Sequence, residues 1–274
     1  MKAAQFDYVA PRDAAEAVSA LAASGGEGKP VGGGQSLGPM LNLRLARPKL
    51  LVDVSAIDAL RRVEDRGENV WIGAGVTHAE IEDGIGGLPA DGMLRSVAAN
   101  IAYRAVRNRG TLGGSLAHAD PAADWPLAIA ALDGVLHVAG PKGRRSIKAD
   151  AYMVAAYTTI LTDDEIIEGV EVPKLSAGAR WGYYKFCRKT GEFPDASAAV
   201  VIDPSRRVSR VFLGALDTAP KACAALAAQL AQSGKWSADD CDKAVAAAAP
   251  DLDNIERATR AGALARALQQ VLPQ

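Results

Sequence analysis

Two glycine-rich segments constrain the fold of this chain more than any other feature of its sequence. The first is GGGQS at residues 32–36, and the second is TLGGS at residues 111–115. Consecutive glycines permit positive φ angles and let backbone N–H groups approach a ligand closely. A run of such N–H groups forms an anion-binding concavity. Two loops of this kind, each near a helix, predict a pyrophosphate that is held from both sides.

The common phosphate-binding fingerprints do not match the first segment. A P-loop needs GxxxxGK followed by Ser or Thr, but Pro39 and Met40 follow Gly38, so the lysine is missing. The dinucleotide fingerprint GxGxxG needs a glycine where Leu37 stands. Each loop alone is equally compatible with an ordinary glycine turn. Their pairing within one domain favours a ligand that carries phosphate.

Length, charge and hydropathy set the class of protein. The 274 residues exceed a usual single domain, so two domains are expected. A formal net charge of −1 and dispersed basic residues argue against nucleic-acid binding. No stretch reaches the roughly 18 apolar residues that a membrane helix needs, and the N-terminus does not resemble a signal peptide. We therefore expect a cytoplasmic protein without a membrane span.

The spacing of cysteines and histidines argues against a metal site. No CxxC pair exists, which disfavours a disulfide scaffold or a chain-borne iron–sulfur cluster; the three cysteines are Cys187, Cys223 and Cys241. The histidines show no HExxH motif or other short pair; they are His78, His118 and His137. The sequence therefore predicts no metal in this chain.

Local patterns predict a mixed fold of helices and strands. Asp13 and Thr77 are expected N-caps, and Glu80 completes a capping box with Thr77. Up to a boundary near residues 173–178, helices are expected at 13–23, 37–45, 77–83 and 93–105, and strands at 50–54, 70–74 and 135–139. Beyond the boundary, strands at 181–188, 196–203 and 207–215 precede helices at 222–231, 238–248 and 254–271. Strands followed by helices are typical of an α+β fold.

Three stretches of the sequence resemble a known family. They are VGGGQSLGPMLNLRLARPKLLVDVS, IAYRAVRNRGTLGGSLAHADPAADWPLAI and YYKFCRKTGEFPDASAAVVI. The first two resemble the paired FAD-binding motifs of molybdenum hydroxylase flavoproteins, the medium subunits of carbon monoxide dehydrogenases and related xanthine-dehydrogenase-type enzymes. The third is similar to the start of that family's C-terminal domain. Order and spacing match, and the resemblance covers nearly the whole chain.

The resemblance implies an α+β fold in two domains. Residues 1–173 are expected to form a two-lobed FAD-binding domain of the vanillyl-alcohol-oxidase/PCMH type, with lobes of about 1–54 and 55–173. Residues 178–274 are expected to form a carbon-monoxide-dehydrogenase-flavoprotein-like domain, with a three-stranded antiparallel sheet and a helical cover.

The same resemblance implies a set of FAD-binding residues. These are Gly32, Gly33, Gly34, Gln35, Ser36, Leu37, Thr111, Gly114, Ser115, Ala117, Asp124 and Lys185. Asp124 is a candidate acceptor for a ribose hydroxyl, although a carboxylate at a helix N-terminus is favourable in any case. Lys185 is a candidate neighbour of the isoalloxazine carbonyl edge, or else a solvated strand residue.

Other residues near these motifs have weaker interpretations. His118 is more plausible as a polar loop residue than as a ligand contact. The cluster of Arg104, Arg107 and Arg109 indicates a solvated face or a subunit contact rather than a phosphate clamp. Phe193 stands where the family often carries Tyr, so ring contact with the flavin is retained and a hydroxyl hydrogen bond is lost.

The function implied is that of an FAD-binding, electron-transferring subunit. Electrons from a molybdopterin–molybdenum large subunit cross the [2Fe-2S] clusters of a small subunit, reach FAD on this chain and leave for an external acceptor. A dimer of heterotrimers is expected, and no catalytic acid or base is required of this chain. Two alternatives remain: a free-standing flavin oxidase of the vanillyl-alcohol class, and an interaction module that kept the fold and lost FAD.

Overall fold

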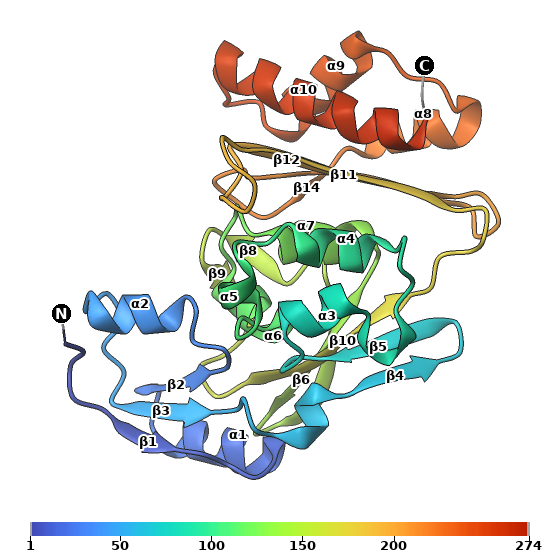
Figure 1. The fold of residues 1–274 in the computed structure, drawn as a ribbon. Helices are drawn as coiled ribbons and strands as arrows, with labels where there is room; N and C mark the ends of the chain where they lie inside the picture. The colour runs from blue at the N-terminus through green and yellow to red at the C-terminus, as the bar shows by residue number, and fades with distance from the viewer. Residues whose placement is uncertain (1, 273–274) are drawn as a thin grey trace.

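The computed structural model describes residues 2–272, in which helices pack around four β-sheets. In Figure 1 the chain runs from a small N-terminal sheet, through a central five-stranded sheet and its helices, to a four-stranded sheet under the C-terminal helices. The mixed helix and strand content expected from the sequence is confirmed.

The N-terminal sheet is parallel and small. Its order is β1 (Asp7–Val9), β3 (Leu50–Asp53), β2 (Gly28–Val31). Helix α1 (Ala14–Ala23) packs on it and begins at Asp13, whose carboxylate accepts a hydrogen bond from the Glu16 N–H, as predicted. Since β2 and β3 are parallel and paired from Gly28 to Val31, both end at the same edge. The first glycine loop leaves from that edge.

The central sheet is antiparallel and carries helices on one face. Its strands, in order, are β4 (Val63–Arg66), β5 (Asn69–Gly73), β10 (Ile166–Pro173), β6 (Val135–Gly140) and β7 (Gly143–Lys148). The main core holds Ile72, Leu136 and Val170 of this sheet together with buried residues of its helices. Those helices include α3 (His78–Asp83), α4 (Met93–Ala99), α6 (Leu112–His118) and α7 (Asp124–Ala131).

Short elements connect these layers. They are the 3-10 turns η1 (Asp58–Arg61) and η2 (Ile85–Gly87), helices α2 (Leu37–Asn42) and α5 (Arg104–Arg107), and the hairpin β8 (Met153–Ala155) and β9 (Thr158–Thr159). The capping box predicted for α3 is present, with Thr77 and Glu80 exchanging hydrogen bonds.

The C-terminal sheet lies between two helical layers (Figure 1). Its strands are β11 (Arg180–Phe186), β12 (Ala196–Asp203), β13 (Val208–Gly214) and β14 (Lys221–Ala222), and its outer helices are α8 (Ala224–Ser233), α9 (Ala238–Ala248) and α10 (Asn254–Val271). Every residue of β12 is buried, because Ala199 and Val201 join the main core while Ala198 and Val200 face the outer helices. Among residues 2–272, no helix has both the length and the apolar content to cross a membrane.

The expectation of three strands in this sheet was wrong. The fourth strand, β14, has two residues and pairs with Phe212 and Leu213 of β13. Two residues after Pro220 are too few to show strand alternation, so periodicity alone does not reveal this strand.

The single helix expected over residues 93–105 was also wrong. The chain forms α4 and α5 with a break between them, in which Ala102 has a φ of 42°. The guanidinium of Arg107 donates to the carbonyls of Ile101 and Ala102, at 2.9 and 3.0 Å. These carbonyls therefore bond to a side chain instead of continuing a helix.

The contact between α10 and β11 depends on Gly182. A Cβ added to Gly182 would lie 2.1 Å from the carbonyl oxygen of Ala267, so the helix backbone lies directly on the strand. We expect Gly182→Ala to lower the free energy of unfolding by about 1–3 kcal/mol, because α10 must shift.

Gly178→Ala is the matched control. A Cβ at Gly178 would meet nothing within 4 Å, so we expect that variant to be neutral or slightly stabilised. Chemical denaturation of both variants measures the difference. Equal stabilities would show that α10 does not pack this closely on β11.

Candidate functional site

The two glycine loops lie against each other. A Cβ added to Gly33 would lie 1.7 Å from the carbonyl oxygen of Arg109 and 2.8 Å from the backbone nitrogen of Gly110. A Cβ added to Gly32 would lie 2.9 Å from Oγ1 of Thr111. Only glycine at these positions lets the two backbones touch without a shift. The segments that the sequence predicted to act together, residues 32–37 and 111–115, are therefore brought together; we call them the paired loops.

The first loop connects β2 to α2 and leaves its middle open. Gly34 has a φ of 69°, a left-handed conformation that glycine adopts without strain. A Cβ on Gly34 would approach only Val31, at 3.9 Å. Gln35 and Ser36 are exposed, and Gln35 donates from Nε2 to the carbonyl of Gly33 at 3.3 Å.

The second loop is fixed to the segment before α3. The carbonyl of Gly110 accepts from the His78 N–H at 2.9 Å, and the Leu112 N–H donates to Val76 at 3.0 Å. Thr111 caps α6, since its Oγ1 accepts from the Gly114 N–H at 3.1 Å. These bonds hold the second loop in one conformation against the first loop.

The predicted residues on α6 share one side of that helix. Leu112, Gly113 and Leu116 are buried, and a Cβ on Gly113 would lie 2.4 Å from the Cβ of Ala74. Gly114 and Ala117 are exposed, and Ser115 is half-buried. The accessible side of α6 therefore carries the residues that were predicted to contact FAD.

A buried histidine supports the second loop from below. His78 is 5% exposed, and its Nδ1 accepts a hydrogen bond from the indole N–H of Trp125 at 3.0 Å. A Cβ on Gly110 would lie 2.9 Å from Nε2 of His78, so the ring lies directly against the loop. Burial, with a smaller contribution from the charge of Arg107, lowers the pKa of His78 to about 4. The ring is therefore neutral near pH 7 and serves as an acceptor.

Asp124 and Lys185 form a buried ion pair. Asp124, the first residue of α7, is 6% exposed, and Nζ of Lys185 on β11 lies 3.1 Å from its Oδ2. The Tyr183 hydroxyl donates to Oδ1 at 2.7 Å, and Lys185 also donates to the carbonyl of Asn100 at 2.9 Å. Burial raises the pKa of Asp124, whereas Lys185 and Tyr183 oppose that shift. Both residues thus already have protein partners, and their contact with FAD stays a prediction.

Sequence reasoning missed Tyr183 and the Asn100 carbonyl. A signal for Tyr183 was available, because residues two apart on a strand point to the same face. Tyr183 and Lys185 have that spacing on β11. The position of Asn100 depends on the break between α4 and α5, which the sequence did not predict.

The three clustered arginines have different surroundings. Arg107 is buried, and Nε lies 2.8 Å from Glu82, so a solvated face was wrong for this residue. Arg104 is more exposed and pairs with Glu82 at 2.7 Å and with Asp83 at 2.5 Å. Arg109 is exposed at the start of the second loop.

Phe193 lies on the loop between β11 and β12. It is 66% exposed. The loop packs closely on the break before α5, since a Cβ on Gly191 would lie 2.5 Å from the carbonyl of Ala102. The contact of Phe193 with a flavin stays a prediction.

His118, the last residue of α6, faces Tyr157 with ring centroids 5.3 Å apart.

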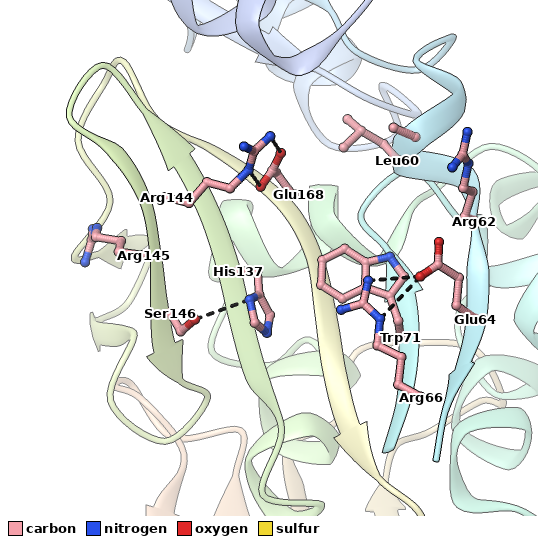
Figure 2. A pocket seen from close by; sticks show the side chains of 11 residues that line it. Leu60, Arg62, Glu64, Arg66, Trp71, His137, Arg144, Arg145, Ser146 and Glu168 are labelled. Atoms are coloured by element: carbon pink, nitrogen blue, oxygen red, sulfur yellow. Dashed lines mark hydrogen bonds and ion pairs between the residues drawn. The ribbon is translucent and has the colours of Figure 1, made fainter. Parts of the chain in front are cut away.

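A cavity of about 390 Å³ opens elsewhere, on the outer face of the central sheet. Figure 2 shows Arg144 paired with Glu168 and Ser146 bonded to His137 within it. Three of its four arginines form ion pairs with Glu64, Glu168 and Glu165. No predicted FAD-binding residue lines this cavity, so we do not assign it to the site.

Within residues 2–272, no group of His, Cys, Asp or Glu side chains has the arrangement of a metal site.

The buried His78 predicts a specific pH dependence of stability. Its pKa is about 4 in the folded chain against an ordinary value of 6.5. Between these values the unfolded chain binds more protons, so stability falls as the pH falls from about 6.5 to about 4. In His78→Gln, whose amide oxygen can still accept from Trp125, this contribution of up to about 1.4 kcal/mol per pH unit should be absent. Denaturant unfolding across this range measures both slopes, and parallel pH profiles would contradict a neutral, buried His78.

Comparison with known proteins identifies the family of this chain. The family described as FAD binding domain in molybdopterin dehydrogenase matches residues 4–175. The nicotine 6-hydroxylase medium subunit of Paenarthrobacter nicotinovorans is 39% identical over 212 residues, which cover 77% of this chain and 74% of that protein. The carbon monoxide dehydrogenase medium chain of Hydrogenophaga pseudoflava is 36% identical over 219 residues, covering 80% and 76%.

Solved structures extend the similarity to nearly the whole chain, the C-terminal sheet and its helices included. A chain of carbon monoxide dehydrogenase from Hydrogenophaga pseudoflava superposes with a TM-score of 0.90 at 32% identity, covering 99% of this chain and 98% of that one. Quinoline 2-oxidoreductase from Pseudomonas putida 86 gives a TM-score of 0.88 at 29% identity, covering 99% and 98%. The resemblance found in the sequence is confirmed, and nothing in these comparisons favours a free-standing oxidase. The chain belongs to the family of FAD-binding medium subunits of molybdenum hydroxylases, which are oxidoreductase components.

Proposed function

We propose that this chain holds FAD with its pyrophosphate across the paired loops. One observation carries the proposal: Gly33 lies against the Arg109–Gly110 backbone, so two glycine loops that are distant in the sequence meet at one place. The open space at Gly34 and the exposed Gly114 fit a cofactor that approaches the backbone closely. Backbone N–H groups are suitable donors to phosphate oxygens in such a concavity.

The proposed binding residues extend from the loops toward the C-terminal sheet. They are Gly32, Gly33, Gly34, Gln35, Ser36, Leu37, Thr111, Gly114, Ser115 and Ala117, followed by Asp124 and Lys185. We propose that Asp124 lies near a ribose hydroxyl of the cofactor and that Lys185 borders the isoalloxazine carbonyl edge, where its ammonium supplies positive charge. Bound FAD supplies the redox chemistry, and the chain supplies binding, orientation and electrostatics.

We also propose the arrangement of domains and subunits. The outer helices α8, α9 and α10 form a core of their own with the C-terminal sheet, and α1 forms another with the N-terminal sheet. Both cores support a two-lobed domain of the vanillyl-alcohol-oxidase/PCMH type, a boundary near residues 173–178 and a second domain. The relatives are named medium chains or subunits, which supports a [2Fe-2S] small subunit and a molybdopterin large subunit as partners. We propose a dimer of such heterotrimers.

Noncovalent FAD is the first expected outcome of this function. Acid precipitation of the purified chain should release a yellow flavin with the mass of FAD, because the concavity holds it through backbone and polar contacts. Flavin that stays with the precipitate would contradict noncovalent binding. FMN in its place would contradict the role given to the pyrophosphate.

A second experiment distinguishes the subunit from an oxidase. Affinity purification of the tagged chain from its native host should recover an iron–sulfur protein and a molybdopterin protein. The chain purified alone should oxidise no alcohol or amine in an oxygen-uptake assay. Turnover by the isolated chain would favour the oxidase class instead.

Gly33→Ala tests whether the loop contact is needed for binding. The added Cβ would lie 1.7 Å from Arg109, so the loops must separate, and we expect FAD affinity to fall at least about tenfold. Gly38→Ala is the matched control in α2, where a Cβ meets nothing within 4 Å. Flavin fluorescence gives the affinities, and melting of the apo chain shows whether each variant folds. Full affinity in a folded Gly33→Ala variant would contradict the paired loops.

A further inference from the structure

Arg109 occupies a different electrostatic position from its two neighbours in the arginine cluster. Its backbone carbonyl touches Gly33 of the first loop, while its side chain is exposed. Arg104 and Arg107 are held by acidic side chains on α3. In the described part of the chain, the guanidinium of Arg109 has no hydrogen bond or ion pair of its own. The guanidinium is therefore free to bind a ligand, and the backbone of Arg109 lies at the junction of the two loops.

The opposite side of this junction is the end of the parallel sheet. Asp53 ends β3 and pairs with Val31, the last residue of β2, from which the first loop departs. The Asp53 carboxylate accepts hydrogen bonds from the backbone of Ser55, at 2.9 Å, and from the hydroxyl of Tyr8. Burial raises the pKa of Asp53, whereas these hydrogen bonds and the charge of Arg109 bring it below its ordinary value. Arg109 is therefore within electrostatic reach of Asp53, at the end of the parallel sheet from which the first loop departs.

A pyrophosphate at this junction needs positive charge. Each of its two phosphates is ionised, and the backbone donors of the loops carry only partial charges. The helices that follow the loops have six and seven residues, so their dipoles are small. The Asp53 carboxylate, which is within electrostatic reach of Arg109, would repel an anion. A guanidinium is suited to this position, because its planar donors match phosphate oxygens.

We propose that the guanidinium of Arg109 binds the pyrophosphate of FAD at the junction of the paired loops. This inference rests on the proposed function and adds a residue outside both glycine loops. Arg109 then has two tasks: its backbone supports Gly33, and its side chain neutralises the ligand. The alternative is that the Arg109 side chain is only solvated, or that it contacts a partner subunit.

The test compares flavins with and without phosphate. The full-length apo chain is titrated with FAD and with riboflavin, which lacks the pyrophosphate, at low and high NaCl. The variants are Arg109→Gln, Arg109→Lys and the control Arg62→Gln, an exposed arginine at the outer cavity of the central sheet. Melting of each apo variant checks that the fold is retained.

Arg109→Gln should weaken FAD binding about tenfold, or about 1.4 kcal/mol, and should reduce its salt dependence. Riboflavin binding should not change, Arg109→Lys should recover most of the affinity, and Arg62→Gln should match wild type. Equal losses for FAD and riboflavin would overturn the proposal, since they would indicate a loop defect. Unchanged FAD binding by Arg109→Gln would also overturn it while leaving the proposed function intact. A wild-type chain that binds no FAD would overturn both.

Discussion

The contact of Gly33 with the Arg109–Gly110 backbone brings together two loops that lie far apart in the sequence. The first loop leaves the small parallel sheet, and the second is bonded to the segment before α3, which packs on the central sheet. A side chain at Gly33 would force these two loops away from each other. The meeting of the two glycine loops therefore depends on two backbones that approach as closely as van der Waals contact allows.

The ion pair of Asp124 with Lys185 joins another two elements that are distant in the sequence. It connects α7 of the N-terminal part to β11 of the C-terminal sheet, with Tyr183 completing the carboxylate's hydrogen bonds. A buried carboxylate without its partner is strongly destabilising, so these residues hold each other in place. These contacts hold β11 of the C-terminal sheet against the start of α7. A flavin between the two elements would meet a defined electrostatic environment.

The sequence predicted the features that depend on neighbouring residues. The caps at Asp13 and Thr77 were correct because capping requires only residues within one helical turn. Strand β10, at the centre of the main sheet, was not predicted, because a register shift after Ile167 interrupts its alternation. The contact of Gly33 with Arg109 links two irregular loops, for which no periodicity exists. The pairing of the two loops was predicted from their glycine chemistry and from the resemblance, and their spatial contact came from the structure.

We propose that both glycine loops form a single FAD site. Amide hydrogen exchange of the full chain, measured with and without saturating FAD, tests it most directly. A single site predicts that residues 32–37 and 111–115 gain protection together, while the outer face of the central sheet around His137 and Ser146 does not change. Protection of only one loop, or of neither loop while FAD is bound, would contradict a single site.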